Sequence, residues 1–214
     1  MARNKYPEVT VDKILEVSKR LFLTKGYDDT TIQDIVNELG GLTKGAIYHH
    51  FKSKEEIMHA LGNSLFFENN PFEAVKGRAD LNGLQKIREM LSLNQSDATR
   101  ANFNKQALPI LKNPRILAAA IEANLRILTP LWFVLLEEGR QDGSIKTEYA
   151  KELAELLPLL NFWLLPSVYP ATAEELHHKF SFMVEMLDKM GLPMFSDEMK
   201  ALTEKQLAEL SPKQ

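Results

Sequence analysis

The stretch TTIQDIVNELGGLTKGAIYHHFKSKEE, residues 30–56, decides the fold. Its first part carries apolar residues at spacings of three and four, which indicates one buried face of a helix: Ile32, Ile35, Val36 and Leu39. Thr31 stands just before this face, and Asp34 follows three residues later, close to the capping-box pattern that begins a helix. Gly40-Gly41 breaks the pattern, so we predict a helix of about nine residues followed by a tight turn.

Two further helix starts follow the turn. Thr43 is the expected N-cap of a second short helix, and Ser53 with Glu56 forms a capping box for a longer one. An earlier amphipathic segment begins after Thr10 and stops at Gly26. Three short helices with a glycine turn between the second and third are the helix-turn-helix arrangement.

The rest of the chain is also predicted to be helical, because its apolar residues recur at three and four positions and strand signals are scarce. We expect helices at about 82–95, 104–112 (broken by Pro109), 114–141, 148–165, 172–190 and 197–210. The fold class is therefore all-α. We predict a helix-turn-helix head in residues 1–52 and a larger helical domain in 53–214, with a connecting helix that starts near 54.

Composition and charge exclude several classes of function. The chain has 214 residues, a net charge of −3 and no cysteine, which excludes disulfides, thiolate catalysis and cysteine metal sites. Residues 1–60 hold nine Lys/Arg and nine Asp/Glu, so the net charge of this segment does not indicate nucleic-acid binding. The apolar run 156–165 is too short to span a membrane, and no signal peptide is expected, so we predict a cytoplasmic protein without membrane contact.

Residues 30–56 closely resemble the tetracycline-repressor (TetR) family, and the preceding RLFLTKGY, residues 20–27, resembles the end of that family's first helix. The segment LEEGRQDGSI, residues 136–145, is similar to the family's turn before its dimerisation helices. One departure is the turn at Gly40-Gly41, which is one residue longer than in many members and is expected to tilt the recognition helix slightly. The resemblance implies a homodimer that binds a double-stranded DNA operator and responds to a small molecule.

The DNA-facing residues are predicted around the second helix of the motif, whose N-terminal end enters the major groove. Lys44 lies in the first turn, where a cation is unfavourable for the helix itself, and this cost favours a role in DNA binding. Ala46 is small enough to meet a thymine methyl group. The predicted DNA-binding residues are Thr31, Thr43, Lys44, Gly45, Ala46, Tyr48, His49 and Lys54.

The larger domain is expected to hold the effector. It is rich in aromatic side chains, and apolar walls with a few polar groups are typical of ligand pockets. The same aromatics at helical spacing are also typical of an ordinary core, and the sequence does not separate the two interpretations. The predicted pocket residues are Phe66, Asn102, Phe103, Asn124, Arg126, Trp132, Phe133 and Trp163, and the expected effector is small and largely apolar.

By resemblance, the helices at 148–165 and 172–190 pair with their copies in a four-helix dimer interface. The predicted interface residues are Leu153, Leu156, Leu157, Leu160, Leu164, Phe180, Met183, Val184 and Leu187. Two-fold symmetric heads need two half-sites about 34 Å apart, and so a near-palindromic operator.

Two other classes of protein are compared with the DNA-binding regulator. No catalytic motif is present and the five histidines form no recognisable site, so we expect no enzyme, no catalytic residue, no metal and no cofactor. The alternative is a DNA-bound structural or partner-binding protein of the same fold without a small-molecule pocket. We predict a repressor, although activation would depend on operator position and is invisible in the sequence.

Overall fold

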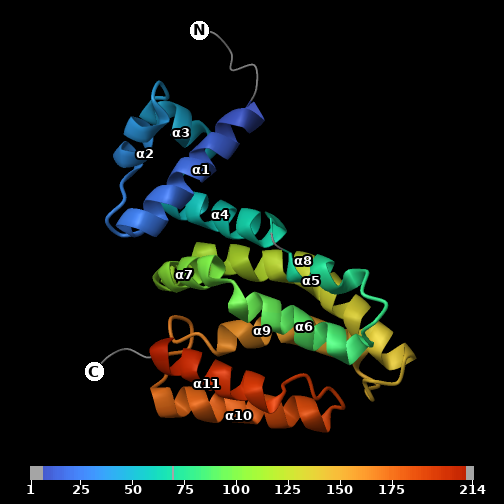
Figure 1. Cartoon of the computed structure of the whole chain (residues 1–214). Coiled ribbons are helices and arrows are strands. Elements are labelled where there is room, and N and C mark those ends of the chain that lie inside the picture. The colour runs from blue at the N-terminus through green and yellow to red at the C-terminus, as the bar shows by residue number, and fades with distance from the viewer. Residues whose placement is uncertain (1–6, 69, 211–214) are drawn as a thin grey trace. The chain divides into compact units, whose positions relative to one another are not determined.

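The computed structural model describes residues 7–68 and 70–210, and every regular element within these ranges is a helix (Figure 1). The α-helices are α1 Pro7–Lys25, α2 Ile32–Leu39, α3 Lys44–His50, α4 Lys54–Glu68, α5 Pro71–Lys76, α6 Gly83–Ser96, α7 Ala98–Ala107, α8 Pro114–Gln141, α9 Ala150–Trp163, α10 Ala173–Lys189 and α11 Asp197–Leu210. A 3-10 segment, η1, spans Leu108–Lys112. This confirms the predicted all-α class.

The chain divides into two compact units. The first contains the residues up to 69 together with 99–110, and the second contains 70–98 and 111 onward. The predicted boundary after residue 52 differs from this division, because α4 packs against α1 and closes the core of the head. Its Ile57, Met58 and Leu61 are buried there, and α7 belongs to the same unit.

One isoleucine from each of the first four helices is fully buried in the first unit. Ile14, Ile35, Ile47 and Ile57 each have 0% of their surface exposed. Full burial of a side chain of this size stabilises the unit by about 1.5–3 kcal/mol relative to exposure. The four residues therefore set the rotation of each helix about its own axis.

One predicted helix start and one predicted capping box need correction. The first helix begins at Pro7, not after Thr10, and Thr10 is buried inside it. Proline suits this first position because its ring presets the helical φ and its missing N–H is not needed there. At the start of α4, Ser53 accepts from the Glu56 N–H, but the Glu56 carboxylate accepts from Lys52 N–H at 2.7 Å and not from Ser53 N–H.

The predicted and observed helices also differ at α7 and α5, because one is polar and the other is short. The helix predicted at 104–112 begins at Ala98 and ends before Pro109, with η1 continuing as a tighter turn. Its first half is too polar for a clear apolar period. Helix α5 was not predicted, because six residues are too few to show a period, although Phe72 and Val75 bury its inner face.

In the second unit, α6 crosses α8 where two glycines meet. A Cβ atom at Gly83 would lie 2.2 Å from the backbone nitrogen of Gly139, so the helices approach to backbone contact. The Gly83 N–H donates to Asp142 Oδ2 at 2.6 Å, and Lys86 Nζ pairs with Glu138 Oε2 at 2.7 Å beside it. Hydrogen bonds from Ser144 and from the Gly83 N–H lower the pKa of Asp142. This crossing anchors one end of α6.

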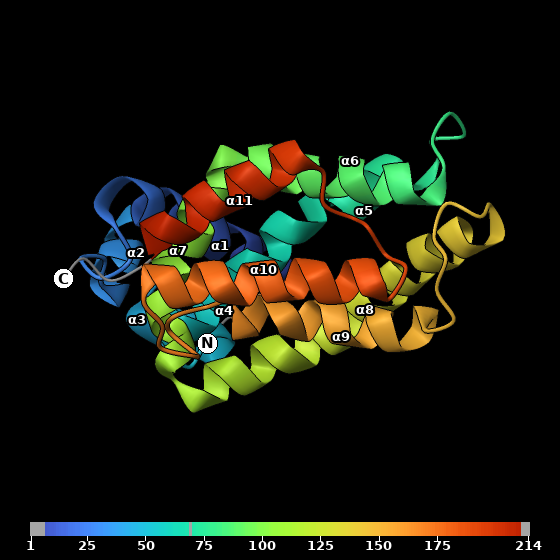
Figure 2. The same cartoon turned by 90° about the horizontal axis from the view of Figure 1, so that it is seen from below.

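The last three helices form a layer in the same unit. Figures 1 and 2 both place α10 beside α9 and α11. Phe180 of α10 stacks edge-on against Phe195, with 5.3 Å between ring centroids. The inner face of α10 is buried by these neighbours.

We expect Gly83→Ala to lower the free energy of unfolding by about 1–3 kcal/mol, because the added methyl forces two backbones apart. Urea denaturation followed by circular dichroism measures this change. Gly77→Ala is the matched control, since nothing lies within 4 Å of a Cβ there and its φ of −89° suits alanine. Equal stability of the two variants would contradict the close crossing.

Candidate nucleic-acid interface

Helix α3 is positioned by one cap and one buried side chain. Thr43 has an extended backbone, and its hydroxyl oxygen accepts from the Ala46 N–H at 3.2 Å, as the sequence predicted. Ile47 is fully buried in the core of the head. Because successive helix residues are about 100° apart, burying Ile47 turns the flanking positions outward. Of the predicted contacts here, Thr43, Lys44, Gly45, Tyr48 and His49 are exposed and Ala46 is half-buried.

Lys44 and Tyr48 lie one turn apart on this outward face. Tyr48 is 45% exposed, and the Lys44 ammonium lies 6.0 Å from the centre of its ring. Among the described residues, Lys44 has no carboxylate partner. A cation and a phenol side by side can contact adjacent phosphates, or a phosphate and a base edge. Behind them, His50 is half-buried and Phe51 is buried.

Thr31 stands at the start of α2 in a complete capping box. Its N–H donates to Asp34 Oδ2 at 2.8 Å, and Asp34 N–H donates to its hydroxyl oxygen at 3.1 Å. Lys25 also pairs with Asp34 at 2.8 Å. The hydrogen bonds from Lys25 and from the Thr31 backbone lower the pKa of Asp34 to about 2. Thr31 is exposed, but its hydroxyl is already used within the head.

The turn between α2 and α3 has left-handed backbone at both glycines. The φ angles are 50° at Gly40 and 117° at Gly41, a region that side chains with a Cβ rarely adopt. No atom lies within 4 Å of a Cβ built at either position. The two glycines are therefore required by backbone shape and not by crowding.

Lys54 is held inside the head. Its ammonium donates to the carbonyl oxygens of Tyr27 at 2.7 Å and Thr30 at 2.8 Å, and it lies 4.1 Å from the centre of the Tyr27 ring. These contacts tie the start of α4 to the turn between α1 and α2. The phosphate contact expected for Lys54 stays a prediction, and the described geometry gives the residue a structural role.

Several other cationic side chains of the head are paired with carboxylates. Arg20 pairs with Glu38 at 2.8 Å, and Lys19 pairs with Glu68 at 2.9 Å. With Lys25 and Lys54 also engaged, Lys44 stands out as a cation on the exposed face of α3. The local placement of charge, and not its sum, distinguishes this surface.

The residues predicted for the effector pocket are spread over both units. Asn102 and Phe103 lie in the first unit, where Phe103 is buried. In the second unit, Trp132 is buried edge-on against Phe72, while Phe133 is 41% exposed. Asn124 and Trp163 are half-buried, Arg126 is exposed, and the side chain of Phe66 lies outside the described residues.

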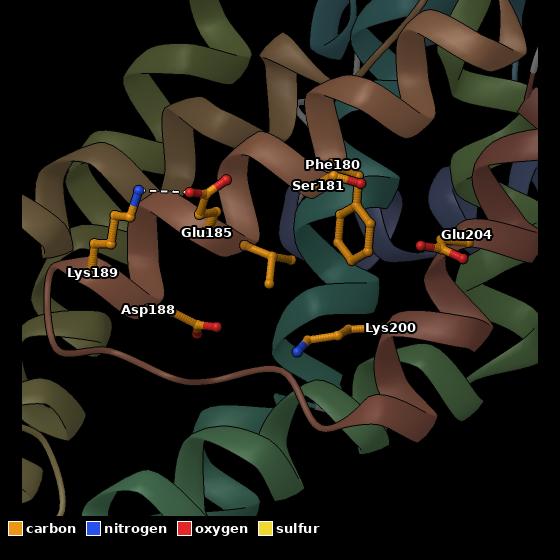
Figure 3. A pocket seen from close by; sticks show the side chains of 8 residues that line it. Phe180, Ser181, Glu185, Asp188, Lys189, Lys200 and Glu204 are labelled. Atoms are coloured by element: carbon orange, nitrogen blue, oxygen red, sulfur yellow. Dashed lines mark hydrogen bonds and ion pairs between the residues drawn. The ribbon is translucent and has the colours of Figure 1, made fainter.

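The described residues of the second unit form several grooves. One, of about 490 Å³, lies between α10 and α11 and is lined by Phe180, Val184 and several charged side chains. Figure 3 shows Phe180 among the charged Glu185, Asp188, Lys200 and Glu204. On the rim of this groove Lys189 pairs with Glu185 at 2.6 Å. A second groove, of about 360 Å³, separates α6 from α11, and a third, of about 600 Å³, lies on α8 and includes Arg126. Of the predicted pocket residues, Arg126 lines one of these grooves.

The predicted dimer residues require a correction. Seven of the nine are buried within a single chain and can give a partner little area: Leu153, Leu157, Leu164, Phe180, Met183, Val184 and Leu187. Leu156 is exposed and Leu160 is half-buried. Both helices carry more than one apolar face, and the prediction chose mainly the face that packs inside the chain.

The outward face of α9 and α10 holds apolar residues that sequence reasoning missed. Leu159 is exposed, and Phe182 is 59% exposed with its ring 6.0 Å from that of Trp163. Lys179 Nζ lies 5.5 Å from the Trp163 ring and 5.4 Å from the ring of the exposed Tyr169. The signal was present in the sequence, because residues 156–160 are apolar over a wider arc than one helix face.

A capped recognition helix with an exposed cationic and aromatic face, held on a bundle of three other helices, defines a helix-turn-helix DNA-binding regulator. The family model described as "Bacterial regulatory proteins, tetR family" matches residues 14–61. The helix-turn-helix head of the chain, residues 14–61, therefore matches this family. Its members are regulators and not enzymes, in agreement with the sequence analysis.

Individual relatives extend this likeness beyond the head. The HTH-type transcriptional repressor KstR2 of Rhodococcus jostii is 29% identical over 148 residues, which cover 66% of this chain and 71% of that protein. The HTH-type transcriptional regulator TtgR of Pseudomonas putida is 47% identical over 53 residues, 25% of each chain. The crystal structure of a transcriptional regulator from Cytophaga hutchinsonii matches 95% of both chains, with a TM-score of 0.58 at 15% identity. This last likeness concerns the fold.

We expect Lys54→Met to lower the free energy of unfolding by about 1–3 kcal/mol, because two carbonyl oxygens lose their charged donor. Chemical denaturation measures the loss. Lys52→Met is the control, since Lys52 is exposed and its recorded hydrogen bond is made by the backbone N–H. If both variants unfold at the same denaturant concentration, the ammonium does not support the head.

Proposed function

We propose that the chain is a ligand-responsive repressor that binds a near-palindromic operator as a homodimer and is released by a small, largely apolar effector. DNA binding is assigned to residues 1–52. Effector binding and dimerisation are assigned to residues 53–214, a functional boundary that differs from the packing boundary. The protein acts in the cytoplasm, where bacterial operators lie.

The exposed face of α3 carries the proposal. Lys44 and Tyr48 project from a helix whose rotation is set by buried Ile47, while Gly45 and the half-buried Ala46 leave room for close approach of the backbone. The exposed His49 flanks them. In this proposal Lys44 and Tyr48 contact phosphates or groove edges, Thr43 adds a hydroxyl contact from the start of α3, and the exposed Thr31 lies at the DNA-facing start of α2.

Dimerisation is proposed through the outward face of α9 and α10. This face comprises Leu156, Leu159, Leu160, Trp163 and Phe182. Exposed aromatic and leucine side chains gathered on one surface are typical of the centre of a protein interface. A two-fold axis there presents two heads to two half-sites, which explains why a single short recognition helix is sufficient.

Release is proposed as a linkage between two equilibria. An effector that prefers a conformation with wrongly spaced heads weakens operator binding, and the operator must weaken effector binding by the same factor. The alternative is a partner-binding protein of the same fold without a small-molecule pocket. The described residues predicted for the pocket are spread over two units, and Arg126 among them lines a groove on α8.

We expect selection from a random duplex pool to yield a near-palindromic motif with the wild-type protein. The variant Lys44→Ala/Tyr48→Ala should bind that motif at least roughly tenfold more weakly, because each lost contact costs about 1–3 kcal/mol. Binding is measured by fluorescence anisotropy at fixed salt. Lys76→Ala, an exposed cation of the second unit, controls for loss of general charge.

Two results would count against DNA recognition by α3. One is the absence of any enriched motif at low salt, and the other is equal binding by the α3 variant and the Lys76→Ala control. Titration of the full protein with a hydrophobic fluorescent dye then separates the two candidates, the effector sensor and the partner-binding protein. Saturable binding that the operator weakens supports an effector sensor, whereas binding that the operator leaves unchanged supports the partner-binding alternative.

We expect Leu156→Asp/Phe182→Asp to halve the mass of the assembly in sedimentation equilibrium, because two buried charges per chain would have to enter the interface. Leu93→Asp is the control, because Leu93 is an exposed leucine on α6 outside this face. A mass equal to that of the wild type would place the dimer interface elsewhere.

A further inference from the structure

The first two thirds of α8 lack a buried side. None of residues 114–131 is buried, and the first buried residue of the helix is Trp132. Yet α8, with 28 residues, is long and apolar enough by length and composition to cross a membrane, a property that the core helices of soluble proteins share. Leu125 is 43% exposed in this segment. An apolar helix with no buried face lacks the packing that normally stabilises it.

A groove of about 600 Å³ runs along this segment. All the residues that line it belong to α8: Ala118, Ile121, Glu122, Leu125 and Arg126. Ala118 is the small residue among them. Small side chains allow a second helix to approach closely, and the spacing of three and four residues suits helix-to-helix packing.

Two charges on the groove are one helical turn apart and opposite in sign. Neither Glu122 nor Arg126 makes an ion pair among the described residues. If an identical helix lies antiparallel across the groove, with a two-fold axis at residue 124, Glu122 of each copy faces Arg126 of the other. The same symmetry sets Arg115 opposite Phe133, a cation against an exposed ring. The segment is therefore complementary to itself.

The geometry points to a second copy of this chain on the α8 groove, paired antiparallel about a two-fold axis at residue 124. This interface is separate from the α9–α10 face proposed for dimerisation and goes beyond the proposed function. Charge complementarity selects the occupant, because a second copy places a carboxylate opposite each Arg126 and a guanidinium opposite each Glu122.

Engineered cysteines test the pairing directly, because the chain has no cysteine of its own. Residue 125 is one position from the axis, so its two copies are offset by only about 3 Å along the helices, whereas the two copies of residue 118 are offset by about 18 Å. A disulfide needs Cα atoms within about 7 Å. We expect Leu125→Cys to form a disulfide-linked pair under mild oxidation, and Ala118→Cys, on the same groove, to stay monomeric on a non-reducing gel.

Charge reversal tests the symmetry in the Leu125→Cys background. Glu122→Arg places two arginines opposite each other at both ends of the pair, and we expect it to slow disulfide formation about fivefold. Adding Arg126→Glu restores the opposite charges and should restore the rate. Glu73→Lys, which reverses an exposed charge on α5, should leave the rate unchanged.

The outcomes separate this interface from the other one. Cross-linking of Leu125→Cys that persists with Leu156→Asp/Phe182→Asp supports an independent α8 pair. Equal cross-linking of the 118 and 125 variants, no cross-linking of either, or failure of the double charge reversal to restore the rate would each overturn the pairing. None of these results depends on operator or effector binding.

Discussion

Burial of one isoleucine from each of four helices is the constraint on which the head depends. Ile14, Ile35, Ile47 and Ile57 are fully buried, and each fixes which side of its helix faces outward. For α3 this has a functional result, because burial of Ile47 turns Tyr48, about 100° further around the helix, to the outside, and Lys44, one turn before Tyr48, is exposed beside it. The proposed reading surface is thus a consequence of how the core of the head is packed.

The second unit is organised by a different kind of contact. Its α6 and α8 meet backbone to backbone at Gly83 and Gly139, with Asp142 capping the start of α6. That end of α8 is closely packed, whereas residues 114–131 of the same helix have no buried member. One helix therefore serves as a scaffold at one end and offers free apolar surface at the other.

The positive charges of the head show how placement outweighs number. Lys25, Arg20 and Lys19 pair with carboxylates, and Lys54 supports two backbone carbonyls. Their charges are used within the head, and Lys44 is left on the exposed face of α3. A domain with balanced charge can therefore present a local cationic surface while its other charges maintain the fold.

Local sequence was enough to predict the all-α class and the helix-turn-helix head, because both follow from apolar spacing along the chain. It also located the starts of α2 and α3, because caps such as Thr31 and Thr43 act over three residues of chain. It could not determine which apolar face of α9 and α10 is covered, since several faces of each helix are apolar and only packing against distant segments selects one. Leu157 and Phe180 were therefore assigned outward and are buried, while Phe182 was overlooked and is exposed. The role of Lys54 was hidden for the same reason, because its carbonyl partners lie 24 and 27 residues away in the chain.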